Sequence, residues 1–216
     1  MILTQDIGTL QLNNEVKTMF RSIINEERRS LGFLEQVSSA FDFLTKEYGF
    51  RCVESETTFV RYESHSVFVN VYHGRSSYEL GVEIGELFNR PKTEQQRFTI
   101  GEIMEVKSMR NKEGFTFFQA STKERVMKYV PKLAEYVKHY AVDALLGDHN
   151  IFTQLEELRE RKSQQYLKEI EVKRIREKAG IAWREKNFEE FTKLYDTVQD
   201  KLTPAEKAKL RYARKK

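Results

Sequence analysis

The sequence predicts an α+β protein. Helices cover an antiparallel three- to four-stranded meander, and a long linking helix leads to a C-terminal helical hairpin. Three observations support this: apolar residues recur every three or four positions over most of the chain, they alternate with polar residues over residues 58–85, and residues 159–165 contain no apolar residue. We expect an α+β domain at 12–150, a polar linking helix at 151–165 and a helical unit at 166–216.

Two helices are predicted ahead of the sheet. The first begins near Asn14, and its apolar residues are Val16, Met19, Phe20, Ile23 and Ile24. The second begins after Ser30, its expected N-cap, and its apolar stripe is Phe33, Leu34, Val37, Phe41, Leu44 and Tyr48. Gly49 is expected to end this helix in a left-handed C-cap, with Phe50 making the hydrophobic contact that often accompanies such a cap.

Three strands are predicted at residues 58–63, 67–72 and 78–85, where side chains alternate with a period of two. The connections ESHS and HGRSS are short and polar, as hairpin turns require. One face of this meander is aliphatic, and we expect the two preceding helices to cover it. Its residues include Val60, Val67, Val69, Val71, Leu80, Val82 and Ile84.

A short helix and a short strand are predicted after the meander. Thr99 is expected to cap the helix IGEIMEVKSM, because a threonine side chain satisfies free backbone N–H groups at a helix start. The stretch NKEGFTFFQA is expected to form a strand with Phe115 and Phe117 on one side.

A longer helix is predicted to follow, opened by Ser121 or Thr122 and running to about Leu146. Gly147 is expected to end it. Pro131 lies inside the apolar pattern, so we expect a kink or a break just before it.

The C-terminal third is predicted to be helical, with a turn at about Asn187. An apolar stripe resumes after the linking helix at Tyr166, Ile170, Ile175, Ala179, Ala182 and Trp183. The next helix is expected to bury Phe188, Phe191, Leu194, Tyr195 and Val198. Thr203 and Glu206 are expected to form a capping box around Pro204, at the start of a last short helix.

The last 40 or so residues resemble a tetratricopeptide repeat. KNFEEF is similar to the Gly-Asp-Tyr-Glu-Glu-Ala turn of that family, Ala182-Trp183 stand at packing positions of its first helix, and Pro204 stands at its closing proline. Lys186 or Asn187 replaces the turn glycine, and Phe191 replaces a small residue. The resemblance implies a hairpin used for packing or protein contact, and an isolated repeat needs a further surface to pack on. A plain helical hairpin is the alternative.

The chain as a whole also resembles a group of small, uncharacterised bacterial proteins. The resemblance lies in the helix end Tyr48-Gly49-Phe50 and the strand Val60-Arg61-Tyr62-Glu63-Ser64. Some proteins of this build serve toxin immunity or phage defence, so the resemblance implies a role of that kind and assigns no site.

The cysteine count and the N-terminus bear on the compartment. Cys52 is the only cysteine, which excludes an intramolecular disulfide and a cysteine-based metal cage and fits a reducing environment. The stretch MILTQDIGTLQLNNEV lacks the basic and apolar regions of a signal peptide, and no apolar run approaches the roughly 20 residues of a membrane helix. We expect a cytoplasmic protein without membrane contact.

The basic charge is concentrated in the C-terminal third. Residues 151–216 hold 18 Lys and Arg against 12 Asp and Glu, whereas residues 1–150 hold 19 against 21. Such a field attracts nucleic acid or an acidic protein, although a solvated helical surface explains the same composition.

No catalytic, cofactor-binding or metal-binding constellation is predicted. The chain lacks a phosphate-binding glycine loop, a Gly-x-Ser-x-Gly elbow and a His-Glu-x-x-His motif. His139 and Asp143 are four apart on one helix, with Asp148 and His149 following shortly, but a metal site there would need a third ligand and a buried position. Cys52 has no flanking residue except Arg51 that would favour its reactive thiolate form. His65 and His73 lie at opposite ends of the middle strand, roughly 25 Å apart at the rise of an extended chain, and do not share one site.

Candidate partner-binding residues lie on the second face of the sheet and in the C-terminal hairpin. They are Arg61, Phe68, Asn70, Tyr72, Glu79, Glu83, Trp183 and Phe188. On the sheet, either Phe68 or Tyr72 fills the gap left by Gly81, or the aromatic and charged side chains form an open binding surface.

We therefore expect a protein without enzymatic activity or a cofactor that binds another protein or a second copy of itself. A toxin-immunity or phage-defence role is the specific form of this expectation. Nucleic-acid binding through the basic C-terminal helices is one alternative. An unrecognised hydrolase or nucleotide-binding enzyme, with His73 and Arg75 as the residues to test, is the other.

Overall fold

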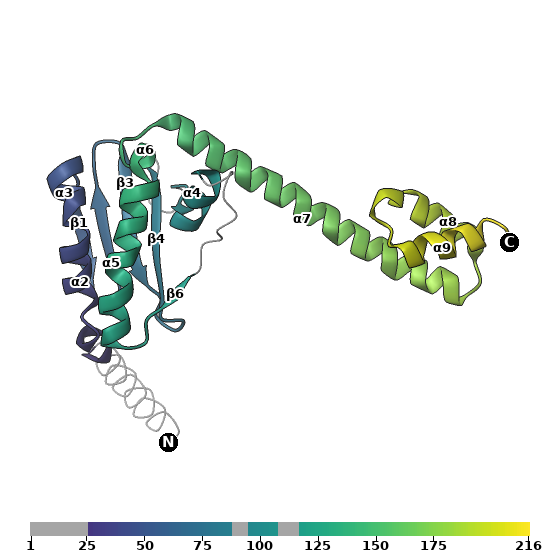
Figure 1. Cartoon of the computed structure of the whole chain (residues 1–216), viewed down its shortest axis with the longest axis horizontal. Helices are drawn as coiled ribbons and strands as arrows, with labels where there is room; N and C mark the ends of the chain where they lie inside the picture. The colour runs from purple at the N-terminus through teal and green to yellow at the C-terminus, as the bar shows by residue number, and fades with distance from the viewer. Residues whose placement is uncertain (1–25, 88–94, 108–116) are drawn as a thin grey trace, which may run out of the picture. The chain divides into compact units, whose positions relative to one another are not determined.

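The computed structural model describes residues 26–87, 95–107 and 117–216 (Figure 1). The chain divides into two compact units, the first ending at Leu155 and the second beginning at Glu156. The first holds an antiparallel sheet with packed helices and the second is helical, which confirms the predicted α+β class. Helix α7 (His149–Arg184) contributes residues to both units. In the described part of the chain, no helix has the length and apolar character needed to cross a bilayer.

The described residues form a sheet of six antiparallel strands, two of which are only two residues long. Strands β2 (Phe59–Glu63), β3 (Val67–His73) and β4 (Glu79–Glu86) form the predicted meander, and β1 (Arg51–Glu56), which is not among the strands predicted for it, pairs with β2 at the edge. Strands β5 (Phe98–Thr99) and β6 (Phe118–Gln119) both pair with β4; β6 lies within the stretch 111–120 where a short strand is predicted, whereas β5 is not predicted. A two-residue strand such as β5 carries no alternating pattern, which is why the sequence does not predict it.

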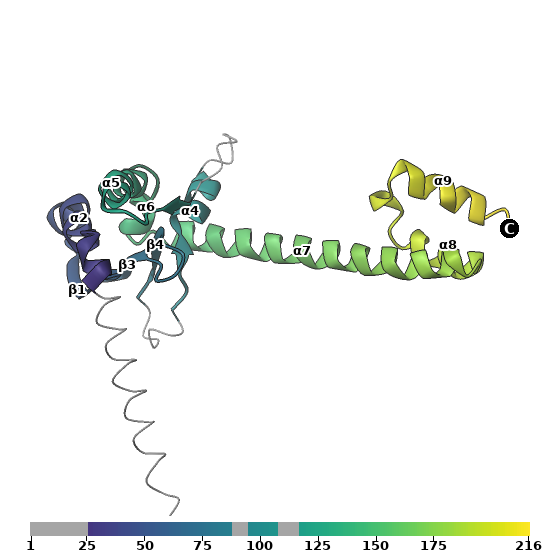
Figure 2. The ribbon, with the colours of Figure 1, turned by 90° about the horizontal axis from the view of Figure 1, so that it is seen from below.

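Helices cover the aliphatic face of the sheet, as predicted. Val60, Val71 and Val82 lie directly opposite one another on β2, β3 and β4, and all three are buried. Figure 2 shows helices α2 (Phe33–Ala40), α5 (Lys123–Tyr140) and α6 (Val142–Leu145) in one layer beside the strands. The covering helices thus come from segments before and after strands β1–β4 in the sequence. The helix expected near Val16 to Ile24 lies outside the described residues.

The helix predicted to run from Ser30 to Gly49 is two helices. Helix α2 ends at Ala40, with Phe41 as its C-cap donating its N–H to Val37 O, and α3 (Asp42–Tyr48) begins immediately afterwards. The expected N-cap is also wrong, because Gly32 precedes α2 and the Ser30 hydroxyl instead donates to Glu27 O.

The predicted end of the second helix is confirmed at α3. Gly49 has φ 69°, and the Phe50 N–H donates to Leu44 O at 3.0 Å. Phe50 is buried, so this left-handed cap directs the chain from the helix layer into β1.

Helix α5 continues through Pro131 without the expected break. Loss of one N–H leaves only a single backbone hydrogen bond unmade, and the buried face holds the helix against the sheet. This face consists of Val126, Val130, Leu133, Ala134 and Val137. The helix ends at Tyr140, earlier than predicted, and α6 then leads to Gly147 at φ 75°.

The other predicted caps of the first unit are present. Thr99 Oγ1 accepts from the N–H of Glu102 at the start of α4 (Ile100–Lys107), and the Glu102 carboxylate accepts from the Thr99 N–H. Thr122 caps α5 by accepting from the Arg125 N–H. Of the two phenylalanines expected to share a strand face, Phe117 is exposed and Phe115 lies outside the described residues.

The second unit combines the later part of α7 with α8 (Phe188–Asp196), the 3-10 turn η2 (Gln199–Lys201) and α9 (Pro204–Ala213). Asn187 caps α8, and Thr203 and Glu206 form the predicted capping box with Pro204 in the first turn. The buried core is Ala179, Ala182, Phe191, Tyr195, Val198, Leu202, Leu210 and Ala213.

The first two residues of the predicted apolar stripe, Tyr166 and Ile170, do not join this core. Tyr166 is 64% exposed and Ile170 is 40% exposed, whereas Val172 and Ile175 are the first α7 residues packed against the core. The stripe therefore begins at Val172 rather than Tyr166, nearly two helical turns later than predicted.

Candidate functional site

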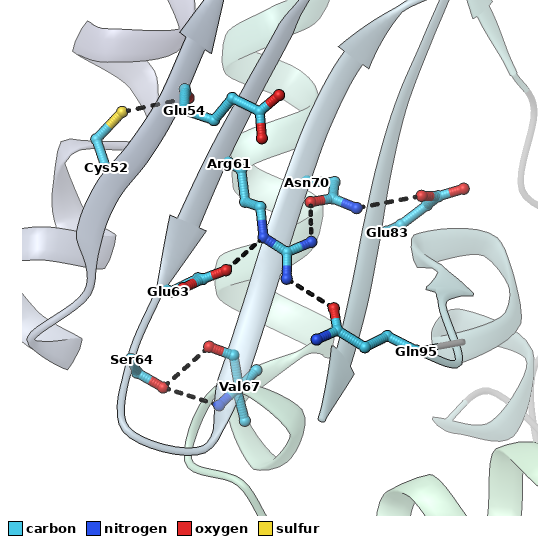
Figure 3. Close-up of polar contacts among 9 residues, drawn as sticks. All are labelled: Cys52, Glu54, Arg61, Glu63, Ser64, Val67, Asn70, Glu83 and Gln95. Atoms are coloured by element: carbon cyan, nitrogen blue, oxygen red, sulfur yellow. Dashed lines mark hydrogen bonds and ion pairs between the residues drawn. The ribbon is translucent and has the colours of Figure 1, made fainter. Parts of the chain in front are cut away.

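A row of polar side chains crosses the second face of the sheet. Arg61 on β2, Asn70 on β3 and Glu83 on β4 lie directly opposite one another in the strand register. The Arg61 guanidinium donates to Glu63 Oε1 at 2.6 Å, to Asn70 Oδ1 at 3.1 Å and to Gln95 Oε1 at 2.8 Å (Figure 3). Asn70 in turn donates to Glu83 at 3.4 Å, so hydrogen bonds connect all three strands. We call Arg61, Asn70 and Glu83 the polar row.

Aromatic rings lie over two glycines beside the polar row. A Cβ at Gly81 would clash with the ring of Tyr72, and a Cβ at Gly85 would clash with the ring of Phe68 and with the backbone oxygen of Gln96. The Arg61 guanidinium lies over the Phe68 ring, 4.1 Å from its centroid. The gap-filling interpretation of Gly81 is thus the one that the structure supports, with Tyr72 as the filling residue.

Burial limits what this face offers to a partner. Arg61, Phe68 and Asn70 are buried, whereas Tyr72, Glu79 and Glu83 are half-buried. Burial, together with the nearby Glu83 and Glu79 carboxylates, raises the pKa of Tyr72 to about 12. The first three residues therefore stabilise the sheet from within, because their burial leaves little surface for a ligand to contact.

His73 belongs to a separate buried cluster on the helix side of the sheet. Its Nε2 donates to Ala120 O at 2.9 Å, and its Nδ1 lies 3.4 Å from Arg28 Nη1. Arg28 also donates to the backbone oxygens of Gly74 and Arg75, and its guanidinium lies 3.9 Å from the Tyr78 ring centroid. Burial and then the neighbouring Arg28 cation lower the pKa of His73 to about 4.

This cluster is a structural clamp on the β3–β4 turn. It joins helical residues 26–30 to the turn through Arg28, a residue that the sequence does not single out. A basic residue on a polar helix face gives no signal of burial, because its partners are backbone oxygens distant in sequence. His65 lies exposed in the other turn, apart from His73 as expected.

The remaining chemical candidates are held by other contacts. Asp143 forms an ion pair with Lys107, and His139 lies edge-on to Tyr140 at 4.6 Å. Cys52 is exposed and its thiol donates to the backbone oxygen of Glu54. Within the described ranges, no three His, Cys, Asp or Glu side chains gather in a metal-binding arrangement.

The two C-terminal candidates, Trp183 and Phe188, come together with a third ring in the second unit. Their centroids are 5.6 Å apart in an edge-to-face arrangement, and Tyr212 of α9 lies 5.9 Å from Trp183 and 6.0 Å from Phe188. Phe191 supports Trp183 from the core at 4.9 Å. Trp183 and Phe188 are partly buried, and Tyr212 is 50% exposed.

These rings form one side of a cleft of about 670 Å³. We call it the aromatic cleft; its lining residues are Trp183, Arg184, Lys186, Phe188, Ala208, Lys209 and Tyr212. The lining contains three cations and no carboxylate. Lys209 Nζ lies 5.3 Å from the centroid of the Trp183 ring, close enough for a cation–π contact.

A second hollow in the same unit has a different character. It measures about 400 Å³ and is lined by Gln165, Lys168, Glu169, Val172, Arg176 and Lys201. Arg176 is bound to Glu206 through two hydrogen bonds, and Glu169 adds a carboxylate to the wall. This hollow therefore lacks both the rings and the unopposed positive charge of the aromatic cleft.

Half of the aromatic cleft could not be predicted from sequence. Trp183 and Phe188 stand near each other across the α7–α8 turn, whereas Tyr212 and Lys209 reach them only because α9 folds back. The spacing of three residues between Lys209 and Tyr212, which places them on one helix face, is the only local signal that these two act together.

The chain matches no family model, no curated protein and no solved structure. The resemblances to tetratricopeptide repeats and to small bacterial immunity or defence proteins therefore stay predictions.

Proposed function

We propose that this protein recognises another protein, and that the aromatic cleft is the contact surface. The observation that carries this proposal is the gathering of Trp183, Phe188 and Tyr212, all with exposed surface, in one cleft whose lining also holds three cations. Tryptophan, tyrosine and arginine supply most of the strong contacts in protein interfaces. A small helical unit that leaves three rings accessible has an apolar surface that a partner can bury.

The choice of this cleft over the sheet face follows from burial. Arg61, Phe68 and Asn70 are engaged with each other and with Glu63 and Gln95, so a partner would have to break existing contacts to reach them. Binding at the cleft breaks no hydrogen bond of these rings, since their contacts with each other are apolar.

Affinity capture with the full-length protein tests this proposal. Extract of the native host is passed over wild type and over Tyr212→Ala, Lys209→Glu and Tyr166→Ala. Tyr166 is an exposed aromatic residue outside the cleft and is the matched control. We expect a protein partner that wild type and Tyr166→Ala retain and that both cleft variants lose. Equal capture by all four proteins, or capture of no partner, would contradict the proposal.

Nucleic-acid binding is the second candidate, and the charge of the C-terminus favours it. Residues 207–216 contain six Lys and Arg and no Asp or Glu. Binding of this kind depends on phosphate contacts, so the affinity for DNA or RNA would fall steeply between low and physiological salt. A filter-binding titration at two salt concentrations decides it, because absence of binding at low salt excludes this function.

The immunity or defence role is the specific biological form of the main proposal. It rests on the sequence resemblance alone. A toxin, nuclease or defence gene beside the gene for this chain would support it, and that toxin would then be the first partner to test.

A further inference from the structure

We infer that the aromatic cleft takes an acidic peptide segment that carries an aromatic or aliphatic side chain. This inference rests on the proposed function and specifies the partner's chemistry. The cleft combines apolar rings with a cationic rim, so its ligand needs an apolar group and negative charge close together.

Several carboxylates of the second unit are already held in ion pairs. Glu206 is held by Arg176, Asp196 by Arg214 and Asp200 by Lys201. In contrast, Arg184, Lys186 and Lys209 form no ion pair in the part of the chain that the structure describes. The cationic rim therefore presents charge that the unit's own carboxylates do not neutralise, and this charge draws acidic groups to the cleft.

The rings supply the apolar part of the site. Trp183, Phe188 and Tyr212 meet at interplanar angles between 59° and 76°, which gives a wall of ring edges and faces. The volume of about 670 Å³ falls within the roughly 300–1,000 Å³ typical of ligand sites. One or two apolar side chains of a peptide fit such a wall, with neighbouring carboxylates reaching Arg184, Lys186 or Lys209.

The same geometry favours a peptide over single-stranded nucleic acid. A stacking platform needs open ring faces on which bases lie. Here Lys209 lies over the Trp183 ring and Lys216 lies over the Tyr212 ring, each at 5.3 Å from the centroid. A base would have to displace these lysines, whereas a carboxylate binds to them where they lie.

The single tryptophan provides the assay, because Trp183 lines the cleft and is the only Trp in the chain. The full-length protein is titrated at low salt with a short peptide of Glu and Asp around a central Phe, and tryptophan fluorescence is followed. The comparison peptides replace Phe by Ser or all acids by Gln. An oligothymidylate tests the nucleic-acid alternative.

We expect saturable binding of the acidic Phe peptide and at least about tenfold weaker binding of both comparison peptides, since each loses on the order of one strong contact. Lys209→Glu should weaken the acidic Phe peptide about tenfold as well, because it reverses a charge on the rim. Lys207→Glu is the matched control on the same helix, exposed and outside the cleft, and should bind as wild type does.

Each other outcome overturns the inference. Equal binding of the Gln peptide shows that charge does not matter, and equal binding of the Ser peptide shows that the apolar group does not. Cleft-dependent binding of the oligothymidylate without the peptide assigns the site to nucleic acid. If no probe binds while Tyr212→Ala still abolishes capture of a host protein, the proposed function stands and the acidic-peptide chemistry is wrong.

Discussion

Two buried arginines of the first unit are stabilised by different means. Arg61 has a carboxylate partner in Glu63 and two amide oxygens, those of Asn70 and Gln95. Arg28 instead binds backbone oxygens, a ring of Tyr78 and the imidazole of His73. The Arg28 arrangement requires a neutral imidazole, because a protonated ring would place a second cation beside the first.

We expect His73 to make the first unit acid-sensitive. Its pKa is about 4 in the folded protein and about 6.5 in the unfolded chain, so the unfolded chain takes up the proton first as pH falls. Stability is therefore complete above about pH 6.5 and declines toward pH 4, by up to about 3 kcal/mol from this group. Urea unfolding at pH 7 and pH 4.5, followed by circular dichroism, measures the loss.

The matched variants for this prediction are His73→Gln and His65→Gln. Glutamine keeps a side-chain N–H for Ala120 O but does not titrate, so His73→Gln should reduce the difference in unfolding free energy between the two pH values. His65 is exposed, and its replacement should leave that difference unchanged. An unchanged difference in His73→Gln would refute the role of this imidazole.

Two glycines should respond to alanine in opposite directions. Gly85→Ala brings a methyl group against the Gln96 backbone oxygen and the Phe68 ring, and we expect it to destabilise the first unit by about 1–3 kcal/mol. Gly180 lies inside α7 with only the Arg184 side chain nearby, so Gly180→Ala should stabilise its helix by about 1 kcal/mol. Denaturant midpoints of the two variants test the pair of predictions. If Gly85→Ala leaves the midpoint unchanged, the Phe68 ring and the Gln96 backbone can move to accommodate the methyl group.

At the scale of the elements, local signals predict element ends well. Gly49, Thr99, Thr122 and Thr203 act at the ends where the sequence places them, because capping depends on side chains within three residues. The break at Phe41 is not predictable in this way. It depends on how Phe33, Val37 and Phe41 reach the core, and the sequence pattern continues across it.

Tertiary contacts likewise limit what could be predicted of the sites. The register of β2, β3 and β4 follows from alternation, so the predicted faces are correct. The alternation does not predict that Arg61 is buried, since this burial requires Gln95 to lie over the sheet. For the same reason Trp183 and Phe188 could be named in advance, whereas Tyr212 and Lys209 enter the cleft only through the position of α9.

The turn between α7 and α8 combines local strain with a cleft cation. Lys186 has φ 58°, a left-handed conformation that disfavours side chains other than glycine. We expect Lys186→Gly to raise stability by roughly 0.5–1 kcal/mol, after the greater freedom of glycine in the unfolded chain is counted. The same variant should bind the acidic Phe peptide more weakly, because the rim loses one charge.

Lys186→Ala separates these two effects. It removes the charge but keeps the strained backbone, so binding should weaken without a gain in stability. Chemical denaturation and the fluorescence titration measure both quantities on each variant. If Lys186→Ala stabilises the unit as much as Lys186→Gly does, relief of backbone strain is not the cause of the gain in stability.

At the scale of the whole molecule, the chain carries two cores. The first is built on the aliphatic face of the sheet and the second around Phe191 and Tyr195. Helix α7 supplies residues to both, but its residues 159–170 are all exposed. Since no buried side chain lies along this stretch of α7, we expect little energetic coupling between the two cores through it.

Independent unfolding of the two units is the resulting prediction. Trp183 reports only on the second unit, whereas circular dichroism reports on both. Thr203→Ala removes the cap of α9 and should lower the stability seen by tryptophan fluorescence by about 1 kcal/mol. Gly85→Ala should shift only a separate part of the dichroism transition and leave the fluorescence midpoint unchanged. Two-state proteins give coincident transitions by all probes, so a fluorescence midpoint that moves with Gly85→Ala would show that the two units unfold as one.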